Sequence, residues 1–407
     1  MDTSDVPLAD LLQVGNSGLR QRAIRALADA DLQTPAFVYD EAGLLANIQS
    51  VRAAIQDSRV ELLFALKAFT VDGGLRRISP YLDGFHVSSH FEARLAREIL
   101  ADGGIVHFTA PSMRSDEAEA IVRCSDMISF NSFSQWQSYR HLQNGSVRMG
   151  LRVNPQLSFL DDERYDPCRR HSKLGEPISR LAKRVREDPA SLDGISGILV
   201  HNNCESRDFA ELRQTIERIE TELAPLLERI DRINLGGGYL FQEAVDPRPL
   251  KEVIARLQSE YGLGVLMEPG AAIAQGAGYL VTTVVDLFES EGREIAVLDT
   301  SVNHVPEVFE YQTRLDVAGA GEGRAHPYIL AGATCLAGDV FGVYAFDERL
   351  TVGARLIVAN RGAYSLVKAN MFNGVNLPAI YGLATDGQLT LKRRFSYEDF
   401  LGRCGIA

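Results

Sequence analysis

Between residues 62 and 268, short apolar runs alternate with longer segments of helical period, and this alternation limits the possible folds more than any other feature of the chain. The eight runs are Leu62–Leu66, Phe85–Ser88, Ile105–Thr109, Met127–Phe130, Arg148–Val153, Gly197–Val200, Arg232–Leu235 and Gly264–Met267. The amphipathic segments between them include Phe91–Leu100, Asp116–Arg123, Phe209–Leu227 and Leu250–Tyr261. Alternation of this kind predicts βα units and a parallel sheet. Eight units over roughly 250 residues predict a (β/α)8 TIM-like barrel, and a doubly wound sheet is the alternative.

The chain changes character after residue 278. The segments Tyr279–Leu287 and Leu356–Val358 are rich in β-branched residues, with Gly, Asp and Pro turns between them, which predicts a β-rich second domain. Residues 36–40 form another β-like run that could pair with the barrel or join this second domain. We therefore predict three parts. They are N-terminal helices and a strand joining the β domain (1–42), a cofactor-binding barrel (43–278) and a C-terminal β-rich domain (279–407).

Composition excludes several classes of function. The 407 residues carry a formal charge of -12, and the scattered basic residues do not form the concentrated basic face that nucleic acid requires. The five cysteines are widely spaced and lack a CxxC pair, so neither a disulfide framework nor a metal site is expected. The sequence has no secretion signal and no apolar stretch of the roughly 18 residues that span a membrane. These features predict a cytoplasmic protein, and the acidic balance is compatible with a small cationic substrate.

Polar residues occupy the carboxyl ends of the predicted strands, where barrel enzymes place their active sites. They include Lys67, Arg152, His201, the run Gly236, Gly237 and Gly238, and Glu268. Each has a structural explanation when taken alone. The Lys67 amine could reach solvent, the glycines could form a tight turn, Glu268 could pair with Arg152, and His201 could be a core residue.

Together these residues match the needs of one ligand, pyridoxal 5'-phosphate. Its aldehyde binds a lysine amine covalently, and its phosphate accepts hydrogen bonds from exposed backbone N–H groups such as a glycine run provides. Its ring nitrogen needs an acidic partner, and its ring face accepts a flat imidazole. A carboxylate such as Glu268 keeps the ring nitrogen protonated and so favours loss of carbon dioxide, whereas an arginine there would suit a racemase.

Nine sequence strings carry a resemblance to a known family over about residues 34 to 378. They are FALKAF around Lys67, ISFNSFSQW from Ile128, YDPCRRHSKLG from Tyr165, VHNNCE from Val200, NLGGG from Asn234, EPGAAI from Glu268, LDTSVNHVPEV from Leu298, GATCLAGDV from Gly332 and FNGV from Phe372. The chain resembles the fold-type III pyridoxal-phosphate decarboxylases, the group of ornithine and diaminopimelate decarboxylases. Within that group it is most similar to the carboxynorspermidine decarboxylases.

The resemblance implies a role for individual residues. Lys67 would hold the cofactor, His201 would stack on its ring, Gly236, Gly237 and Gly238 with Tyr364 would bind phosphate, Glu268 would face the ring nitrogen, and Arg152 would lie near the phenolic edge. It also implies a homodimer with shared active sites. Cys335 would be the partner-contributed proton donor to the reacting carbon, and Asp339 a contact for a substrate amine. An inert thiol, a turn acid and a core aromatic are the respective alternatives for Cys335, Asp339 and Tyr364.

We expect residues 299 to 311 to recognise the substrate, with His304 and Glu307 accepting hydrogen bonds from its distal amines. The alternative is that this segment is a solvated acidic face. We expect decarboxylation of carboxynorspermidine or carboxyspermidine in polyamine biosynthesis. The sequence Tyr-Gln-Thr-Arg after Glu310 and the charged loop 156–171 depart from the family pattern. Because of these departures, the alternative substrate is another amino acid with a distal amine. Examples are a siderophore precursor, a specialised-metabolite precursor and a diaminopimelate-like compound. A racemase and a non-catalytic cofactor carrier are further alternatives.

Overall fold

The structure is a computed structural model that describes residues 8–56, 58–101 and 103–406. The chain divides into two compact units. One comprises Asn47–Lys67 and Ile78–Ile273, and the other comprises the described part of Met1–Ala46, together with Ala68–Arg77 and the described part of Ala274–Ala407. Residues 43–46, 68–77 and 274–278, which we expected in the barrel domain, therefore group with the β-rich part of the chain.

The first unit is a closed parallel barrel. Its strands are β2 Val60–Ala65, β3 Gly84–Val87, β4 Ile105–Phe108, β5 Met127–Phe130, β6 Arg148–Asn154, β8 Gly197–Val200, β9 Arg232–Asn234 and β10 Gly264–Met267. All eight overlap the predicted apolar runs. The order β5-β4-β3-β2-β10-β9-β8-β6 is closed by direct pairing of β5 with β6. This closure confirms the barrel and excludes the doubly wound sheet, while the short β7 Glu176–Pro177 beside β6 was not predicted.

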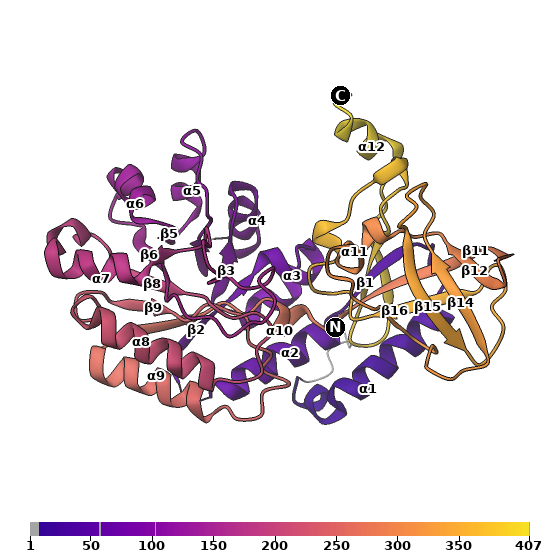
Figure 1. The fold of residues 1–407 in the computed structure, drawn as a ribbon, viewed down its shortest axis with the longest axis horizontal. Coiled ribbons are helices and arrows are strands. Elements are labelled where there is room, and N and C mark those ends of the chain that lie inside the picture. Colours follow the sequence, from indigo (N-terminus) through magenta and orange to yellow (C-terminus); the bar gives the residue numbers. More distant parts are fainter. Residues whose placement is uncertain (1–7, 57, 102, 407) are drawn as a thin grey trace, which may run out of the picture. The chain divides into compact units, whose positions relative to one another are not determined.

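Helices lie outside the barrel strands (Figure 1). They are α4 His90–Leu100, α5 Ala118–Cys124, α6 Phe133–Tyr139, α7 Ile178–Glu187, α8 Ala210–Leu227 and α9 Arg248–Tyr261. In α8 the buried residues Leu212, Ile216, Ile219 and Leu223 recur at helical spacing, so one apolar face covers the sheet. Serine side chains begin two of the helices, because Ser89 accepts a hydrogen bond from Glu92 N in α4 and Ser132 accepts one from Gln135 N in α6.

The second unit contains a nine-stranded sheet. Its strands are β1 Ala36–Asp40, β11 Gly278–Ser290, β12 Arg293–Leu298, β13 Asp316–Val317, β14 His326–Ala331, β15 Val340–Phe346, β16 Arg355–Ala359, β17 Ala379–Leu383 and β18 Leu389–Arg393. Strand β1 pairs antiparallel with β11 and parallel with β17, so residues 36–40 join this sheet rather than the barrel. The remaining helices of the chain are α1 Leu8–Asp29, α2 Glu41–Ala54, α3 Asp72–Ile78, α10 Ala271–Ala274, α11 Glu307–Tyr311 and α12 Tyr397–Arg403.

Helix α1 lies within the segment for which N-terminal helices were predicted. Gly15 has φ 67 and ψ 161 inside it, values outside the helical region, so two helical pieces meet at this glycine. Residues 1–7 lie outside the described part of the chain. Within the described part, no helix combines the length and the apolar content needed to cross a membrane.

Candidate active site in the barrel

The strand ends of the barrel bring the predicted cofactor residues to one rim. Lys67 follows β2, Arg152 lies near the end of β6, His201 follows β8, the glycine run follows β9, and Glu268 follows β10. In a closed parallel barrel the carboxyl ends of all strands surround one opening. These five positions therefore share one rim of the barrel unit.

Lys67 lies in a short 3-10 turn, Leu66–Ala68, directly after β2. Its side chain is exposed. Desolvation by the surrounding protein nevertheless lowers the pKa of the Lys67 amine, and the neighbouring Arg152 lowers it further, while Glu268, Cys204 and Glu92 oppose both effects. A larger neutral fraction makes the amine a better nucleophile toward an aldehyde.

Glu268 is a buried carboxylate, 5% exposed. Its Oε1 accepts a hydrogen bond from His107 Nδ1, and its Oε2 lies 3.5 Å from His86 Nδ1. Burial alone would raise the pKa of this carboxyl group, but the two imidazoles and a hydrogen bond from Asn234 outweigh it and lower the pKa to about 2. Glu268 is therefore ionised at neutral pH. Glu268 thus contacts two histidines, and not only an arginine, as the structural alternative for this residue supposed.

Sequence reasoning missed His86 and His107. They occupy equivalent positions in neighbouring strands β3 and β4, and both are buried. The signal was a single histidine within each apolar run, GFHV and IVHF. A buried pair of imidazoles at matching register in a barrel interior needs a polar partner, and Glu268 is that partner.

The glycine run has no room for side chains. A Cβ on Gly237 would lie 2.3 Å from the Glu268 carbonyl oxygen, and one on Gly238 would lie 2.2 Å from the Asn203 carbonyl oxygen. Gly236 and Gly238 also adopt positive φ values of 68 and 90, which favour glycine. This compact backbone turn is the kind of surface that binds an anion through N–H groups.

His201 packs against the glycine run. Its Nδ1 accepts a hydrogen bond from Gly237 N at 3.2 Å. Burial, together with the charges of Lys67 and Arg152, holds the pKa of His201 well below its usual value, although Glu268 opposes this. The imidazole is therefore neutral at physiological pH, and a neutral flat ring is suited to stack on a cofactor ring.

Arg152 is buried, 8% exposed. Its Nη2 lies 3.5 Å from the His201 carbonyl oxygen, and burial lowers the pKa of its guanidinium, with Cys168 and Glu268 opposing. A guanidinium remains charged through a shift of this direction. Arg152 thus places a cation beside Lys67, His201 and Glu268.

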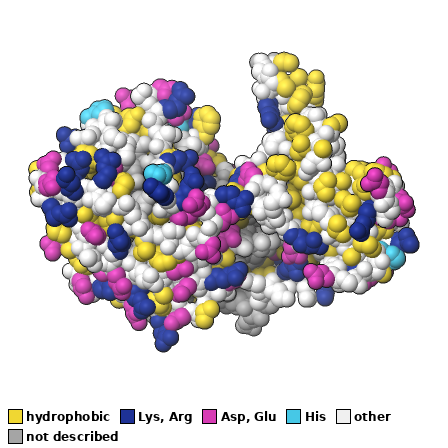
Figure 2. All heavy atoms as spheres, viewed as in Figure 1, with side chains coloured by type: hydrophobic (Ala, Val, Ile, Leu, Met, Phe, Trp, Pro, Cys, Tyr) yellow, Lys and Arg dark blue, Asp and Glu magenta, His cyan; other side chains and the backbone are white. Residues whose placement is uncertain are grey.

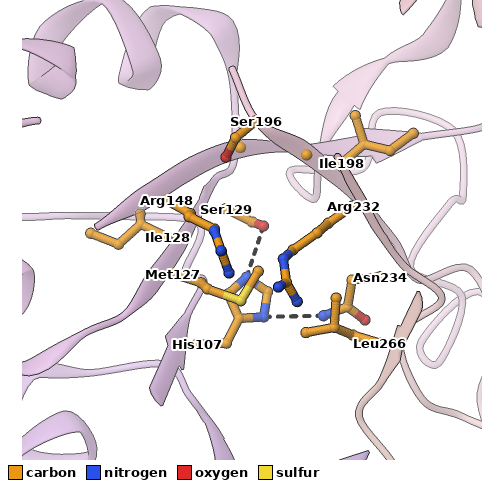
Figure 3. A pocket seen from close by; sticks show the side chains of 12 residues that line it. His107, Met127, Ile128, Ser129, Arg148, Ser196, Ile198, Arg232, Asn234 and Leu266 are labelled. Atoms are coloured by element: carbon orange, nitrogen blue, oxygen red, sulfur yellow. Dashed lines mark hydrogen bonds between the residues drawn. The ribbon is translucent and has the colours of Figure 1, made fainter. Parts of the chain in front are cut away.

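A small cavity lies at the opposite end of the barrel strands (Figure 3). Met127, Arg148, Gly197 and Arg232, which begin β5, β6, β8 and β9, line it. Its volume of about 20 Å³ holds about one water molecule. A substrate does not fit in this volume.

Within the described ranges 8–56, 58–101 and 103–406, no cluster of three or more His, Cys, Asp or Glu side chains is arranged to hold a metal ion.

The other predicted residues belong to the second unit. Cys335 is exposed, and its backbone N–H donates to Asn373 Oδ1 at 2.9 Å. Tyr364 is half-buried, has φ 61, and donates its N–H to the Ala68 carbonyl oxygen at 2.8 Å. The roles given to these two side chains stay predictions.

Asp339 is buried and organises its own loop. Its Oδ1 accepts a hydrogen bond from Val302 N at 2.8 Å, and its Oδ2 accepts bonds from Thr334 N at 3.0 Å and Thr334 Oγ1 at 2.5 Å. Three donors from the same unit already satisfy this carboxylate. These contacts give Asp339 a structural role, and its expected contact with a substrate amine stays a prediction.

Glu307 and His304, the expected amine acceptors, are buried rather than part of a solvated face. Glu307 Oε1 accepts hydrogen bonds from Arg361 Nη1 at 2.8 Å and from Ser365 Oγ. His304 Nδ1 lies 3.0 Å from Thr300 Oγ1, and burial lowers the pKa of this imidazole to about 4. His304 is neutral at physiological pH, and amine binding by either residue stays a prediction.

Comparison with known proteins identifies the family. The model of the family described as "Pyridoxal-dependent decarboxylase, C-terminal sheet domain" matches residues 36–362. The chain belongs to the pyridoxal-dependent decarboxylases.

Two relatives and one solved structure illustrate the likeness. The chain is 38% identical over 382 residues to "Carboxyaminopropylagmatine decarboxylase" of Synechocystis sp., covering 92% of this chain and 96% of that protein. It is 32% identical to "Carboxynorspermidine/carboxyspermidine decarboxylase" of Herminiimonas arsenicoxydans, covering 91% and 99%. Carboxynorspermidine decarboxylase of Campylobacter jejuni, solved with norspermidine, superposes with a TM-score of 0.83 at 30% identity, covering 91% and 100%. The predicted resemblance, fold and decarboxylase class are confirmed.

The glycine run offers a direct test of the anion cradle in this decarboxylase. We expect Gly237→Ala to lower the affinity for pyridoxal phosphate at least about tenfold, because the new Cβ forces the turn away from the Glu268 carbonyl oxygen. Fluorescence titration of the apoprotein with the cofactor measures this loss. Gly402→Ala is the control, since nothing lies within 4 Å of a Cβ there. Unchanged affinity in a folded Gly237→Ala protein would contradict the assignment.

Proposed function

We propose that this decarboxylase binds pyridoxal 5'-phosphate at the barrel rim and removes the α-carboxylate of a carboxylated polyamine. The observation that carries the proposal is the joint placement of a lysine amine, a side-chain-free turn and an ionised buried carboxylate at the strand ends of one barrel. These three groups fit the aldehyde, the phosphate and the ring nitrogen of the cofactor, respectively. When bound, the cofactor supplies an aldehyde that captures the substrate amine and a ring that takes up the electron pair left by carbon dioxide.

The chain's own residues have distinct tasks in this proposal. Lys67 would hold the cofactor through its aldehyde, and its amine would also be placed to move protons near the reacting carbon. Glu268 accepts a hydrogen bond from the protonated ring nitrogen and holds the proton there, because its carboxylate stays ionised. The N–H groups of the run Gly236–Gly238 bind the phosphate, and the neutral His201 ring covers one face.

The names of the relatives support the substrate class. Proteins at 38%, 32% and 31% identity are named for carboxyaminopropylagmatine and for carboxynorspermidine or carboxyspermidine. Carboxyaminopropylagmatine was not among our expected substrates, and its distal end is a guanidine rather than an amine. We place it first, and carboxynorspermidine and carboxyspermidine next.

A panel of substrates tests the proposal. The cofactor-loaded protein should release carbon dioxide from at least one of the three carboxylated polyamines with a kcat/KM at least about a hundredfold above that for diaminopimelate or ornithine. Product identification by mass spectrometry should show loss of one carboxyl group and no change at the distal end. Release from diaminopimelate alone, or racemisation without carbon dioxide, would overturn the proposed substrate class.

We also propose that the chain forms a homodimer. Apolar side chains gather on the visible face of the second unit (Figure 2), and Phe309, Val340 and Val343 are each more than 40% exposed. An exposed apolar area of this kind is typical of an interface between proteins. Sedimentation equilibrium should give twice the chain mass at micromolar concentration, and a monomer would contradict this part of the proposal.

A further inference from the structure

The buried His107 contacts Glu268, the carboxylate proposed to face the cofactor ring nitrogen. His107 lies in β4, one residue before the strand ends, and is 1% exposed. Its Nδ1 is hydrogen-bonded to Glu268 Oε1, and its Nε2 lies 2.8 Å from Ser129 Oγ. Figure 3 shows the imidazole between Ser129 and Asn234, facing the small cavity at the amino-terminal strand ends. Both ring nitrogens are therefore engaged inside the barrel.

The ionised Glu268 carboxylate, rather than the neighbouring amide, determines which nitrogen of His107 carries a proton. Asn234 Oδ1 accepts a hydrogen bond from Gly236 N at 2.8 Å, which fixes the amide and turns its Nδ2 toward His107 Nδ1 at 3.1 Å. An ionised carboxylate only accepts hydrogen bonds, so Nδ1–H must donate to Glu268. The hydrogen bond from Nδ1–H to the charged Glu268 carboxylate is stronger than the bond that the neutral Asn234 amide would donate to an unprotonated Nδ1. Nε2 faces the Ser129 hydroxyl, which can donate or accept, so Ser129 provides the hydrogen-bond partner of this nitrogen.

The other charged groups around Glu268 do not replace this bond. His86 lies 3.5 Å from Oε2, but burial lowers its pKa to about 3, so its charge stabilises Glu268 only in strong acid. Glu268 also interacts electrostatically with Lys67 after β2, Arg152 on β6 and His201 after β8. They lie around the rim where the cofactor is proposed to bind, whereas His107 approaches the carboxylate from within the barrel.

We propose that His107 is a positioning residue that, with Ser129 behind it, fixes the orientation and negative charge of Glu268 for the ring nitrogen of the cofactor. The inference rests on the proposed cofactor site. An unsupported carboxylate at this depth would rotate or take up a proton, because burial disfavours its charge. Either change would leave the ring nitrogen without an anionic partner.

The test measures the protonation state of the cofactor's ring nitrogen. The protein is loaded with pyridoxal phosphate carrying a 15N label in the ring, and the 15N chemical shift reports protonation without turnover. In wild type we expect a protonated ring nitrogen from about pH 6 to about pH 9. In His107→Leu we expect the proton to be lost within this range and kcat to fall at least about tenfold. In His107→Asn, whose amide can donate in place of Nδ1, we expect an intermediate shift and partial recovery of kcat.

One control and one fallback variant make the result decisive. His141→Asn replaces an exposed histidine and should leave the 15N shift, cofactor affinity and kcat at wild-type values. If His107→Leu does not fold, His107→Asn alone decides, since it must still show ring-nitrogen deprotonation at lower pH than wild type. A wild-type 15N profile and a kcat within about twofold of wild type in a folded His107 variant would overturn the inference. Failure of every carboxylated polyamine as substrate would instead overturn the proposed function and leave the 15N result standing.

Discussion

Replacing Glu268 with glutamine should lower kcat about a thousandfold, which corresponds to a loss of about 4 kcal/mol of transition-state stabilisation. Glutamine has nearly the same size but carries no charge, so it cannot hold a proton on the ring nitrogen as an ionised carboxylate does. The cofactor should still bind, because the Lys67 amine and the glycine run are unchanged. Steady-state kinetics of the loaded variant, with cofactor content measured by absorbance, checks this expectation.

Glu260→Gln is the matched control, since Glu260 is an exposed carboxylate at the end of α9. It should keep wild-type kcat. A Glu268→Gln protein with full cofactor content and a kcat within about tenfold of wild type would show that the carboxylate is not the ring partner.

The depressed pKa of Glu268 also sets a pH expectation. A folded-state pKa of about 2 lies below the usual value for glutamate, so ionised Glu268 stabilises the fold above about pH 4. This contribution is lost as the pH falls toward 2. Glu268 should therefore add no acidic limb to the kcat profile of the wild type above about pH 4.

Lys67→Ala should lower kcat by at least about three orders of magnitude. Without the amine, the cofactor aldehyde has no covalent tether, and the proton transfers proposed for the released lysine are lost as well. The visible absorption band of the lysine-bound cofactor should disappear, although phosphate contacts at the glycine run still permit weak binding. Absorption spectra after removal of unbound cofactor and single-turnover assays measure both effects.

Two further substitutions separate covalent attachment from charge at Lys67 and control for the loss of a lysine elsewhere. Lys67→Arg keeps a cation but cannot bind the aldehyde, so it should be as inactive as Lys67→Ala if covalent attachment is the task of this residue. Lys183→Ala removes an exposed lysine from α7 and should behave as wild type. Substantial activity in Lys67→Arg would show that charge, rather than attachment, is what the site requires.

The barrel and its rim could be predicted because the sequence displays them directly. Each strand is a short apolar run, and each run is followed by polar residues or glycines, so strand ends and candidate ligands were located together. Closure of the sheet was harder to predict, because it depends on the pairing of β5 with β6. Apolar runs show that strands exist but do not state which ones pair at the edges.

The supporting residues could not be predicted because their roles depend on register and on distant partners. His86 and His107 lie side by side only because β3 and β4 pair with that register. Glu307 was expected to meet a substrate amine, yet Arg361, 54 residues further along the chain, provides its ion pair. The spacing of these residues along the sequence predicts neither contact.

The most direct test of the account is to locate the residue that carries the cofactor. The loaded protein is reduced with borohydride, which makes the bond between aldehyde and amine permanent, then digested and analysed by mass spectrometry. We expect a pyridoxyl group on Lys67, in the peptide containing Phe-Ala-Leu-Lys-Ala-Phe. Labelling of another lysine, or no labelling in a protein that releases carbon dioxide from its substrate, would contradict it.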